Sequence, residues 1–185
     1  MQWNLEAYYA FVKKLVDAFE SSRLDYAFTG ALAVSFYGVP RTTTDVDILI
    51  MIGDQAQLKD KITSALSKAG LIVNEQKILN AIVSGYKIVN LRDKTLPYSV
   101  DVIFSDVKVQ KKPGKINGVN TFFQSPEGLI AAKLRMIKAT MASERSIKDK
   151  EDIKAILAFT KVNVAEVKKQ ARQDNTLEIF KALNH

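Results

Sequence analysis

The chain has 185 residues, 47% of them hydrophobic, and this length and composition predict one folded domain, with or without a helical extension. It contains no cysteine, which excludes disulfides and zinc–thiolate sites, and its single histidine, His185, argues against histidine-based catalysis and multi-histidine metal sites. No apolar run is long enough to span a bilayer, and the first residues lack the layout of a signal peptide. We therefore expect a cytoplasmic protein with no membrane partner.

The formal net charge of +7 is unevenly distributed along the chain. Residues 1–104 hold 11 Lys and Arg against 11 Asp and Glu, whereas residues 105–185 hold 16 against 9. The whole excess therefore lies in the C-terminal part. Two interpretations follow: a polyanionic partner, or lysine-rich helices whose charges are simply solvated.

The first fifty residues predict two helices and two strands. They are expected at residues 4–20 (helix), 24–28 (strand), 31–37 (helix) and 44–51 (strand). Asn4 is a favourable N-cap for the first helix, whose apolar residues recur at helical spacing. Gly30 indicates a turn before the second helix, and Gly38 and Pro40 end it.

The middle of the chain predicts one more helix and then mostly strands. A helix through Leu58, Ile62 and Leu66 closes at Gly70. Strands are expected at residues 71–75, 86–91 and 98–104, and a lysine-bearing hairpin is expected over residues 107–123. Its turns are predicted at 113–114 (Pro-Gly) and 117–118 (Asn-Gly).

Everything after residue 124 reads as helical. Helices are expected at residues 126–142, at 147–160, after Asn163 and near 176–183. Ser125 and Pro126 form a cap with a first-turn proline, and Asn163 with Glu166 forms a capping box. The predicted organisation is an α/β core over residues 1–124 and a C-terminal helical part over residues 125–185, packed together as one unit.

Asp45 and Asp47 lie two residues apart within an apolar strand. Strand side chains alternate between faces, so both carboxylates point the same way, with Cα atoms ~7 Å apart. The chain contains a second pair of this kind, Asp149 and Glu151, but it is expected on a helix, where the side chains diverge by ~200°. An exposed strand face is the alternative interpretation of the first pair.

Asp101 is a lone carboxylate within the strand predicted at residues 98–104. A buried, unpaired charge is costly, so Asp101 needs a partner. It either pairs with a Lys or Arg or, if the strands are neighbours, joins Asp45 and Asp47. Three carboxylates without histidine or cysteine would suit Mg²⁺ or Mn²⁺.

Thr29, Gly30 and Ala31 lie between a predicted strand and a predicted helix. Glycine allows a ligand to approach the backbone closely, and the first turn of the helix offers free N–H groups to a phosphate. The alternative is that Gly30 only makes a turn.

Together these segments resemble the nucleotidyltransferase superfamily typified by DNA polymerase β. Its signature is Gly followed by Gly or Ser, about a dozen residues, acid-x-acid and a third acid on a later strand. Here it appears as Gly30-Ala31, thirteen residues, Asp45-Val46-Asp47 and then Asp101. The string over residues 29–50 is similar to the minimal nucleotidyltransferases that include AbiEii-type toxins. One departure is Ala31, where a serine would offer a hydroxyl to phosphate.

The resemblance implies an α+β fold, with a nucleotidyltransferase-like mixed β-sheet flanked by helices and a C-terminal helical part. It also implies a nucleotidyltransferase that uses two metal ions, Mg²⁺ or Mn²⁺. Asp45, Asp47 and Asp101 would be both the metal ligands and the catalytic residues, and Thr29, Gly30 and Ala31 would bind the nucleotide. The enzyme would move a nucleoside monophosphate from a nucleoside triphosphate such as ATP to an acceptor hydroxyl.

Two basic residues are further candidates for nucleotide binding. Arg41, just before the acid-bearing strand, either contacts the triphosphate or pairs with an acid. Lys133 falls within the apolar arc of its predicted helix, and Asp149 falls similarly on the next one. They either form a buried pair or both face a cleft, and a lysine that snorkels to solvent is a third interpretation. Our hypothesis is that Lys133 reaches the triphosphate.

The motif does not name the acceptor. The basic C-terminal part favours an RNA end such as tRNA, but a protein or a small molecule is compatible with it. The alternatives in other classes are a degenerate, non-catalytic module that binds nucleic acid or a partner protein, and a metal-dependent nuclease. If the chain acts as a toxin of a toxin–antitoxin system, a cognate antitoxin protein is its expected partner.

Overall fold

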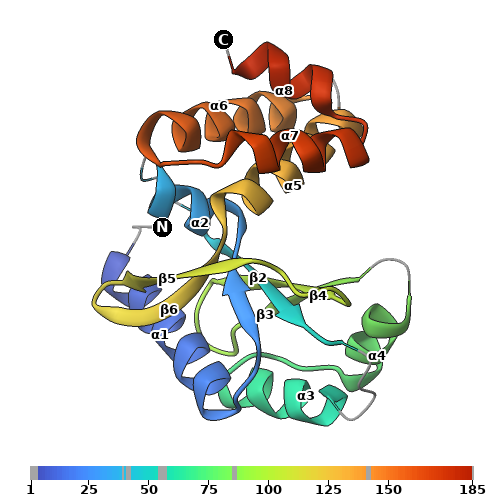
Figure 1. The fold of residues 1–185 in the computed structure, drawn as a ribbon. Helices are drawn as coiled ribbons and strands as arrows, with labels where there is room; N and C mark the ends of the chain where they lie inside the picture. Colours follow the sequence, from blue (N-terminus) through green and yellow to red (C-terminus); the bar gives the residue numbers. More distant parts are fainter. Residues whose placement is uncertain are drawn as a thin grey trace.

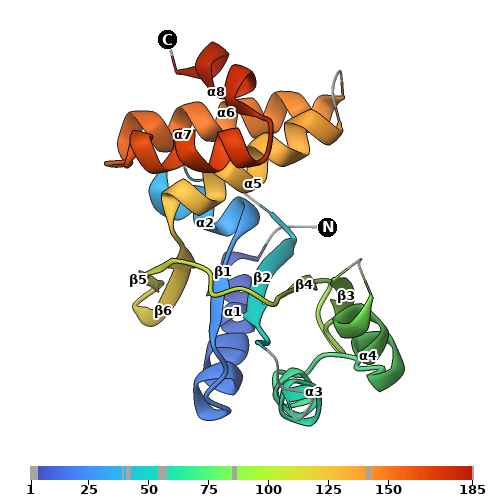
Figure 2. The same cartoon turned by 45° about the vertical axis from the view of Figure 1, so that its right-hand side comes forward.

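The computed structural model describes residues 4–38, 40, 43–53, 58–84, 87–140 and 143–184. Within these ranges a mixed β-sheet lies between two groups of helices (Figures 1 and 2). Helices α1, α3 and α4 lie on one side, and α2 and the C-terminal helices α5 to α8 lie on the other. The α+β architecture expected from the sequence is confirmed.

The strands form one six-stranded sheet in the order β3-β4-β2-β1-β6-β5. Their bounds are β1 (Tyr26–Phe28), β2 (Asp45–Met51), β3 (Ile88–Arg92), β4 (Ser99–Ser105), β5 (Lys111–Ile116) and β6 (Val119–Gln124). The pairs β2–β4 and β1–β6 are parallel, and the others are antiparallel. The sheet is therefore mixed, and β2 lies directly beside β4.

The helices begin where the sequence offers caps. Their bounds are α1 (Leu5–Ser21), α2 (Gly30–Tyr37), α3 (Leu58–Lys68), α4 (Glu75–Val83), α5 (Pro126–Ala139), α6 (Glu144–Phe159), α7 (Val164–Gln173) and α8 (Leu177–Leu183). The side chains of Asn4, Ser125 and Asn163 each accept a hydrogen bond from a backbone N–H in the first turn of the helix that follows. These three predicted caps are confirmed, but the reciprocal half of the predicted capping box is wrong, because the Asn163 N–H donates to Glu127 Oε1 and not to Glu166.

The hydrophobic core lies against the sheet face opposite the acids. Val46, Ile48 and Ile50 of β2 are fully buried, and so are Val100 and Val102 of β4. They join one cluster with the apolar residues of α1 and α3. The alternation of β2 therefore places its apolar residues in the core and its acids on the other face.

The C-terminal helices dock onto the body of the protein through α2. Gly38, at the end of α2, lies against Ala155 of α6, where a Cβ on the glycine would lie 3.1 Å from the alanine methyl. The Thr160 hydroxyl donates a hydrogen bond to the Tyr37 carbonyl. Helix α2, which begins at Gly30, is thus in direct contact with the C-terminal helices.

Two local predictions were wrong. Residues 71–75 do not form a strand, because Leu71 makes only an isolated bridge with Asp93 and helix α4 begins at Glu75. Asn74 caps that helix by accepting a hydrogen bond from the Lys77 N–H, a signal that the short apolar run obscured.

The second wrong prediction is a turn at residues 113–114, which lie within β5. The hairpin turns only at Asn117 and Gly118, which have φ angles of 45° and 82°. Gly114 instead makes room for an aromatic stack, because a side chain there would collide with the rings of Phe36 and Phe123.

In the described part of the chain, no helix combines the length and apolar character needed to cross a membrane.

Candidate active site

The parallel pairing of β2 with β4 brings the three predicted acids together. Asp47 and Asp101 are Cα partners across the two strands, and Asp45 is the partner of Ser99. Since strand side chains alternate, Asp45, Asp47 and Asp101 share one face of the sheet. Asp47 and Asp101 are half-buried, and Asp45 is exposed. The first acid pair is thus not isolated, because a neighbouring strand supplies the third acid.

Two polar neighbours donate hydrogen bonds to the outer acids. The Asn90 Nδ2 group on β3 donates to Asp101 Oδ1 at 2.7 Å, and the Ser99 hydroxyl on β4 donates to Asp45 Oδ1. Each donor is the Cα partner of its acid on the next strand. Neither residue was singled out from the sequence, because only the strand order places it beside an acid.

Asp47 lies between the other two acids and has an unusual electrostatic environment. Burial raises its pKa to about 6, and the charges of Asp101 and Asp45 act in the same direction. Lys133 and Arg145, both from the C-terminal helices, oppose the rise without cancelling it. Burial is thus the main cause of the raised pKa, and the two neighbouring carboxylates add to it.

The three carboxylates suit a hard divalent cation in their chemistry, since Mg²⁺ and Mn²⁺ prefer oxygen ligands. Among the residues that the structure describes, however, no three acidic, histidine or cysteine side chains are already arranged to hold a metal ion. Asp45 and Asp101 each have one oxygen engaged, by Ser99 and Asn90 respectively. The assignment of these acids as metal ligands therefore stays a prediction.

Gly30 lies in direct contact with Asp47. Its φ of +57° is in the left-handed region, and a Cβ at this position would overlap the Asp47 carboxylate. The Thr29 N–H donates to the Asp47 carbonyl at 2.9 Å, which fixes the start of α2 beside β2. Glycine is thus required both for the backbone conformation and for this close approach.

The predicted phosphate-binding segment is partly engaged within the protein. Thr29 is buried, and its hydroxyl donates to Gln124 Oε1 at 2.6 Å. With its N–H bonded to Asp47 as well, Thr29 has used both of its donors. Gly30 and Ala31 are the first two residues of α2, where N–H groups have no acceptor within the helix. The prediction for phosphate contact therefore narrows to these two N–H groups.

Lys133 lies in a buried ion-pair cluster of the helical layer. Its Nζ is 2.7 Å from Asp149 Oδ1 and 2.7 Å from Asp152 Oδ2. All three residues are at most 8% exposed. The buried-pair interpretation of Lys133 and Asp149 is confirmed, with Asp152 as a second acid that the sequence reasoning missed. Asp152 follows Asp149 by three residues, so helical spacing was the signal that could have found it.

Asp149 leaves one oxygen of this cluster unsatisfied. Its Oδ2 is buried without a hydrogen-bond partner in the structure. Glu151, by contrast, is exposed, which confirms that the side chains of the second acid pair, Asp149 and Glu151, diverge on their helix. Arg41, the other basic candidate, lies outside the described residues.

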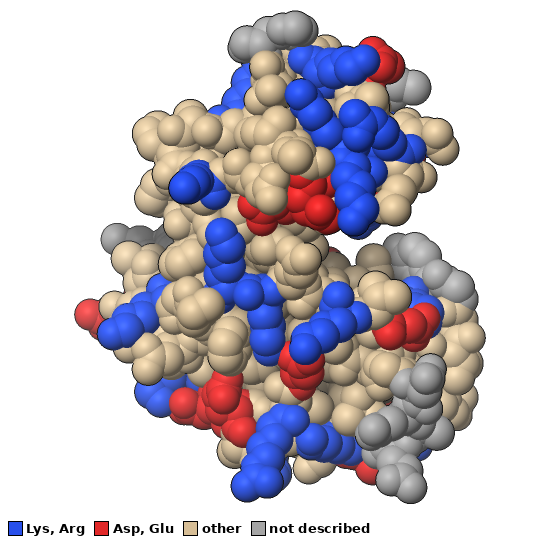
Figure 3. All heavy atoms as spheres, in the orientation of Figure 1, with Lys and Arg blue, Asp and Glu red and all other residues tan. Residues whose placement is uncertain are grey.

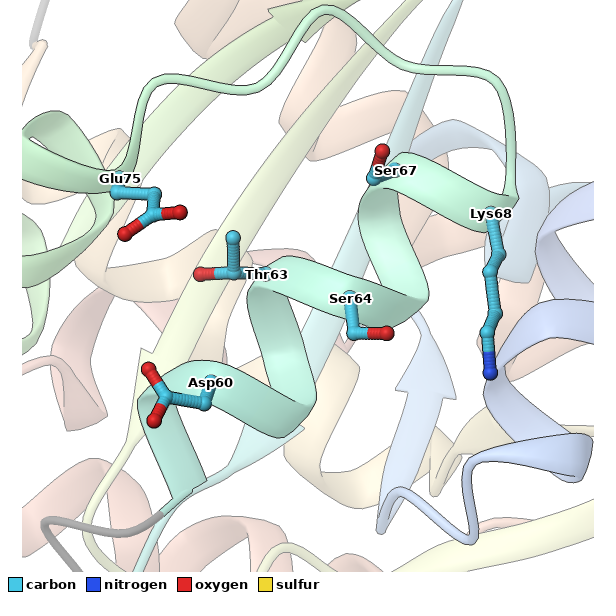
Figure 4. Close-up of a pocket in the computed structure, with 6 residues that line it drawn as sticks. All are labelled: Asp60, Thr63, Ser64, Ser67, Lys68 and Glu75. Atoms are coloured by element: carbon cyan, nitrogen blue, oxygen red, sulfur yellow. The ribbon is translucent and has the colours of Figure 1, made fainter.

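The hollow on the surface between α3 and α4 is not part of the acid site. It has a volume of about 510 Å³ and is lined by polar side chains of both helices (Figure 4). Thr63 and Glu75 point toward the space between the helices, whereas Lys68 extends away from it. Helix α3 lies at the end of β2 opposite to the acids, so this hollow is remote from them (Figure 2).

Solved structures with a similar fold include nucleotidyltransferases. ANT(2'')-Ia, in complex with adenylyl-2''-tobramycin, has 11% sequence identity and a TM-score of 0.64, over 91% of this chain and 97% of that one. A nucleotidyltransferase-like protein from Paracoccidioides brasiliensis has 19% identity and a TM-score of 0.58, over 94% and 91%. The lincosamide adenylyltransferase LnuA has 14% identity and a TM-score of 0.53, over 80% and 96%. The chain thus has the nucleotidyltransferase fold.

The sequence model of the family described as nucleotidyl transferase AbiEii toxin, type IV toxin–antitoxin system, matches residues 11–179. This match covers most of the chain, including all three acids of the candidate site. The protein therefore belongs to the AbiEii nucleotidyltransferase family. A comparison with curated protein sequences gives no match.

Proposed function

We propose that the protein transfers a nucleoside monophosphate from a nucleoside triphosphate to an acceptor hydroxyl, with Mg²⁺ or Mn²⁺ as the cofactor. The observation that carries this proposal is the placement of Asp45, Asp47 and Asp101 on one face of two adjacent parallel strands. A cation site of this kind is what a polyanionic triphosphate requires. Membership in a nucleotidyltransferase family supports the same reaction class.

The proposed roles follow from the positions of the residues. Asp45 and Asp47 would hold the cation that accompanies the triphosphate, and Asp101 would complete the site on the acceptor side. When bound, divalent cations neutralise charge and lower the pKa of the attacking hydroxyl. The first-turn N–H groups of Gly30 and Ala31 would contact phosphate oxygens beside Asp47.

In the reaction, the acceptor hydroxyl gives its proton to solvent and its oxygen forms a bond to the α-phosphorus. The bond from that phosphorus to the bridging oxygen breaks in line, and pyrophosphate leaves with the electron pair. Lys133 lies close enough to lower the pKa of Asp47 while paired with Asp149 and Asp152. We therefore assign Lys133 to the phosphate side of the site, and we retain Arg41 there as a prediction.

We propose an RNA end, such as that of tRNA, as the acceptor. The charge excess lies in residues 105–185, and Figure 3 shows Lys and Arg side chains gathered over the C-terminal helices. On α6, Lys148, Lys150 and Lys154 are exposed, and none of them forms an ion pair within the described ranges. Phosphate groups of a nucleic acid would neutralise such a surface. Transfer to a protein or to a small-molecule hydroxyl instead of RNA would replace this assignment.

The family also suggests a biological setting. We propose that the protein acts in the cytoplasm as the toxin of a toxin–antitoxin pair, with a cognate antitoxin protein as its partner. The check is growth of cells that express the wild-type chain or the Asp47→Asn variant. Growth arrest by the wild type alone supports the assignment, and equal growth of both contradicts it.

The decisive experiment is a transfer assay with each of the four labelled triphosphates, Mg²⁺ or Mn²⁺, and separate acceptor pools of tRNA, protein and aminoglycoside. We expect label in the tRNA pool, and we expect Asp45→Asn and Asp47→Asn each to lower transfer by at least about 100-fold. Asp60→Asn, an exposed acid on α3, is the matched control and keeps full activity.

Two outcomes would contradict the proposal. One is the absence of transfer to every pool together with an unchanged melting temperature on addition of Mn²⁺ and triphosphate. This result would show that the protein is not an active nucleotidyltransferase. Salt-sensitive RNA binding without transfer would indicate the non-catalytic binding module instead.

A further inference from the structure

A polar row crosses three strands on the acid face of the sheet. Asn90 of β3, Asp101 of β4 and Asp47 of β2 are successive Cα partners. β3 is an edge strand, so Asn90 begins the row and Asp47 ends it. The acid that the proposed function places on the acceptor side therefore has a neutral amide on its outer flank.

The Asn90 side chain contributes little to the packing of the fold. Its side chain is exposed, whereas its neighbours Val89 and Leu91 point to the other face and are buried. Asparagine is also disfavoured in strands, so packing and strand propensity do not favour it at this position. The one hydrogen bond of the Asn90 side chain in the described structure is the 2.7 Å bond from Nδ2 to Asp101 Oδ1.

An amide is a particular choice of partner for an acid that must stay charged. A lysine at position 90 would place a positive charge beside Asp101, as Lys133 does beside Asp149 and Asp152. Asparagine instead orients the carboxylate and leaves its charge in place. Asp101 Oδ2 has no hydrogen-bond partner in the part of the chain that is described, so this oxygen stays available to a ligand.

We propose that Asn90 is a positioning residue that holds the Asp101 carboxylate in its working orientation through the Nδ2–Oδ1 hydrogen bond. This inference rests on the proposed function. Asn90 does not touch the reacting atoms and acts only through Asp101. Ser99 makes the corresponding contact with Asp45 on the next strand.

The kinetic test compares Asn90→Asp with Asn90→Ala. Aspartate has the shape of asparagine but replaces the donor by a second negative charge facing Asp101. We expect Asn90→Ala to lower kcat by about 10-fold and Asn90→Asp by about 100-fold, with the KM for triphosphate unchanged. A purely steric role predicts the opposite order. Asn120→Asp, an exposed asparagine on β6, is the control and leaves kcat unchanged.

A double-mutant cycle separates a role through Asp101 from any other role. In the Asp101→Asn background, Asn90→Ala should have no further effect on the remaining activity, because the carboxylate that it positions is gone. Additive losses would overturn the proposal.

A second readout is independent of activity. In nitrogen-edited NMR spectra, one Nδ2 proton of Asn90 should show a hydrogen-bonded shift that Asp101→Ala removes and Asp60→Ala preserves. A free Asn90 carboxamide in the wild type, or an Asn90→Asp variant as active as the wild type, overturns the positioning role alone. A wild-type protein that transfers no nucleotide while this bond is intact overturns the proposed function instead.

Discussion

The protein has one cluster of acids on the sheet and another in the C-terminal helices, and the two differ in whether a lysine pairs with them. Asp149 and Asp152 in the helical layer have a cation built into the fold, because Lys133 lies 2.7 Å from both. Asp45, Asp47 and Asp101 on the sheet have donors from Ser99 and Asn90 but no ion pair in the described residues. Acids without a cation of their own mark the place where a charged ligand belongs.

The comparison also shows how the clusters are linked. Lys133 lowers the pKa of Asp47 although its ion pairs are with other acids. None of the ion pairs within the described residues involves the three sheet acids, which favours a metal–triphosphate ligand there.

The largest effect is expected from removing the built-in cation. Lys133→Met removes the ammonium group that lies 2.7 Å from both Asp149 and Asp152, and we expect it to lower the free energy of unfolding by about 3 to 5 kcal/mol. Urea denaturation at pH 7.5 measures this change. Lys154→Met, an exposed lysine on α6, is the control and should change stability by less than about 0.5 kcal/mol.

Equal stability of the two lysine variants would mean that Lys133 does not stabilise the buried acids Asp149 and Asp152. If Lys133→Met does not fold, Lys133→Arg keeps the charge and tests the phosphate role separately. Wild-type affinity for triphosphate in Lys133→Arg is what a phosphate role predicts, whereas unchanged affinity in Lys133→Ala would remove Lys133 from the nucleotide site.

The opposite change, removing an uncompensated charge, should stabilise the protein. The pKa of Asp47 is raised from 3.8 to about 6 in the folded state, so folding favours its protonated form. The resulting destabilisation is absent below pH 3.8, develops between pH 3.8 and about 6, and is complete above that range. At pH 7.5 we expect Asp47→Asn to raise the free energy of unfolding by about 1 to 3 kcal/mol.

This gain should shrink toward zero as the pH approaches 4, and urea denaturation across the range measures it. Asp60→Asn serves as the exposed control, with no gain at any pH. A loss of stability in Asp47→Asn at pH 7.5 would show instead that the charged carboxylate of Asp47 stabilises the folded protein. If Asp47 is kept for function at a cost in stability, Asp47→Asn should lose activity and gain stability.

The smallest effect concerns the glycine that allows Asp47 to lie against α2. Gly30 and Gly53 have similar φ angles of +57° and +50°, but only Gly30 has a neighbour where a Cβ would be placed. Gly53→Ala should therefore cost about 1 kcal/mol from backbone strain alone, and Gly30→Ala about 1 kcal/mol more.

Thermal unfolding of the two alanine variants measures the difference, and the transfer assay adds a second criterion. Only Gly30→Ala should lose activity, because its methyl group displaces the Asp47 carboxylate. Equal stability and equal activity in the two variants would show that the contact between Gly30 and Asp47 has no functional importance.

Local patterns predicted the parts of the site that depend on short-range geometry. The alternation around Asp45 and Asp47 placed both acids on one face, and the caps at Asn4, Ser125 and Asn163 located three helices. The same local reasoning failed at residues 71–75, where an apolar run of strand type only leads into α4. A short apolar run does not distinguish a strand from a buried connection.

The sequence by itself determined which acids share a face, that Gly30 begins a helix, and which family the motif resembles, because these features depend on neighbours a few residues apart. Only the tertiary structure decided that β4 lies beside β2, that Asn90 and Ser99 donate to the outer acids, and that Asp152 shares Lys133. Strand order and helix docking depend on burial across the whole chain, so no local spacing encodes those contacts.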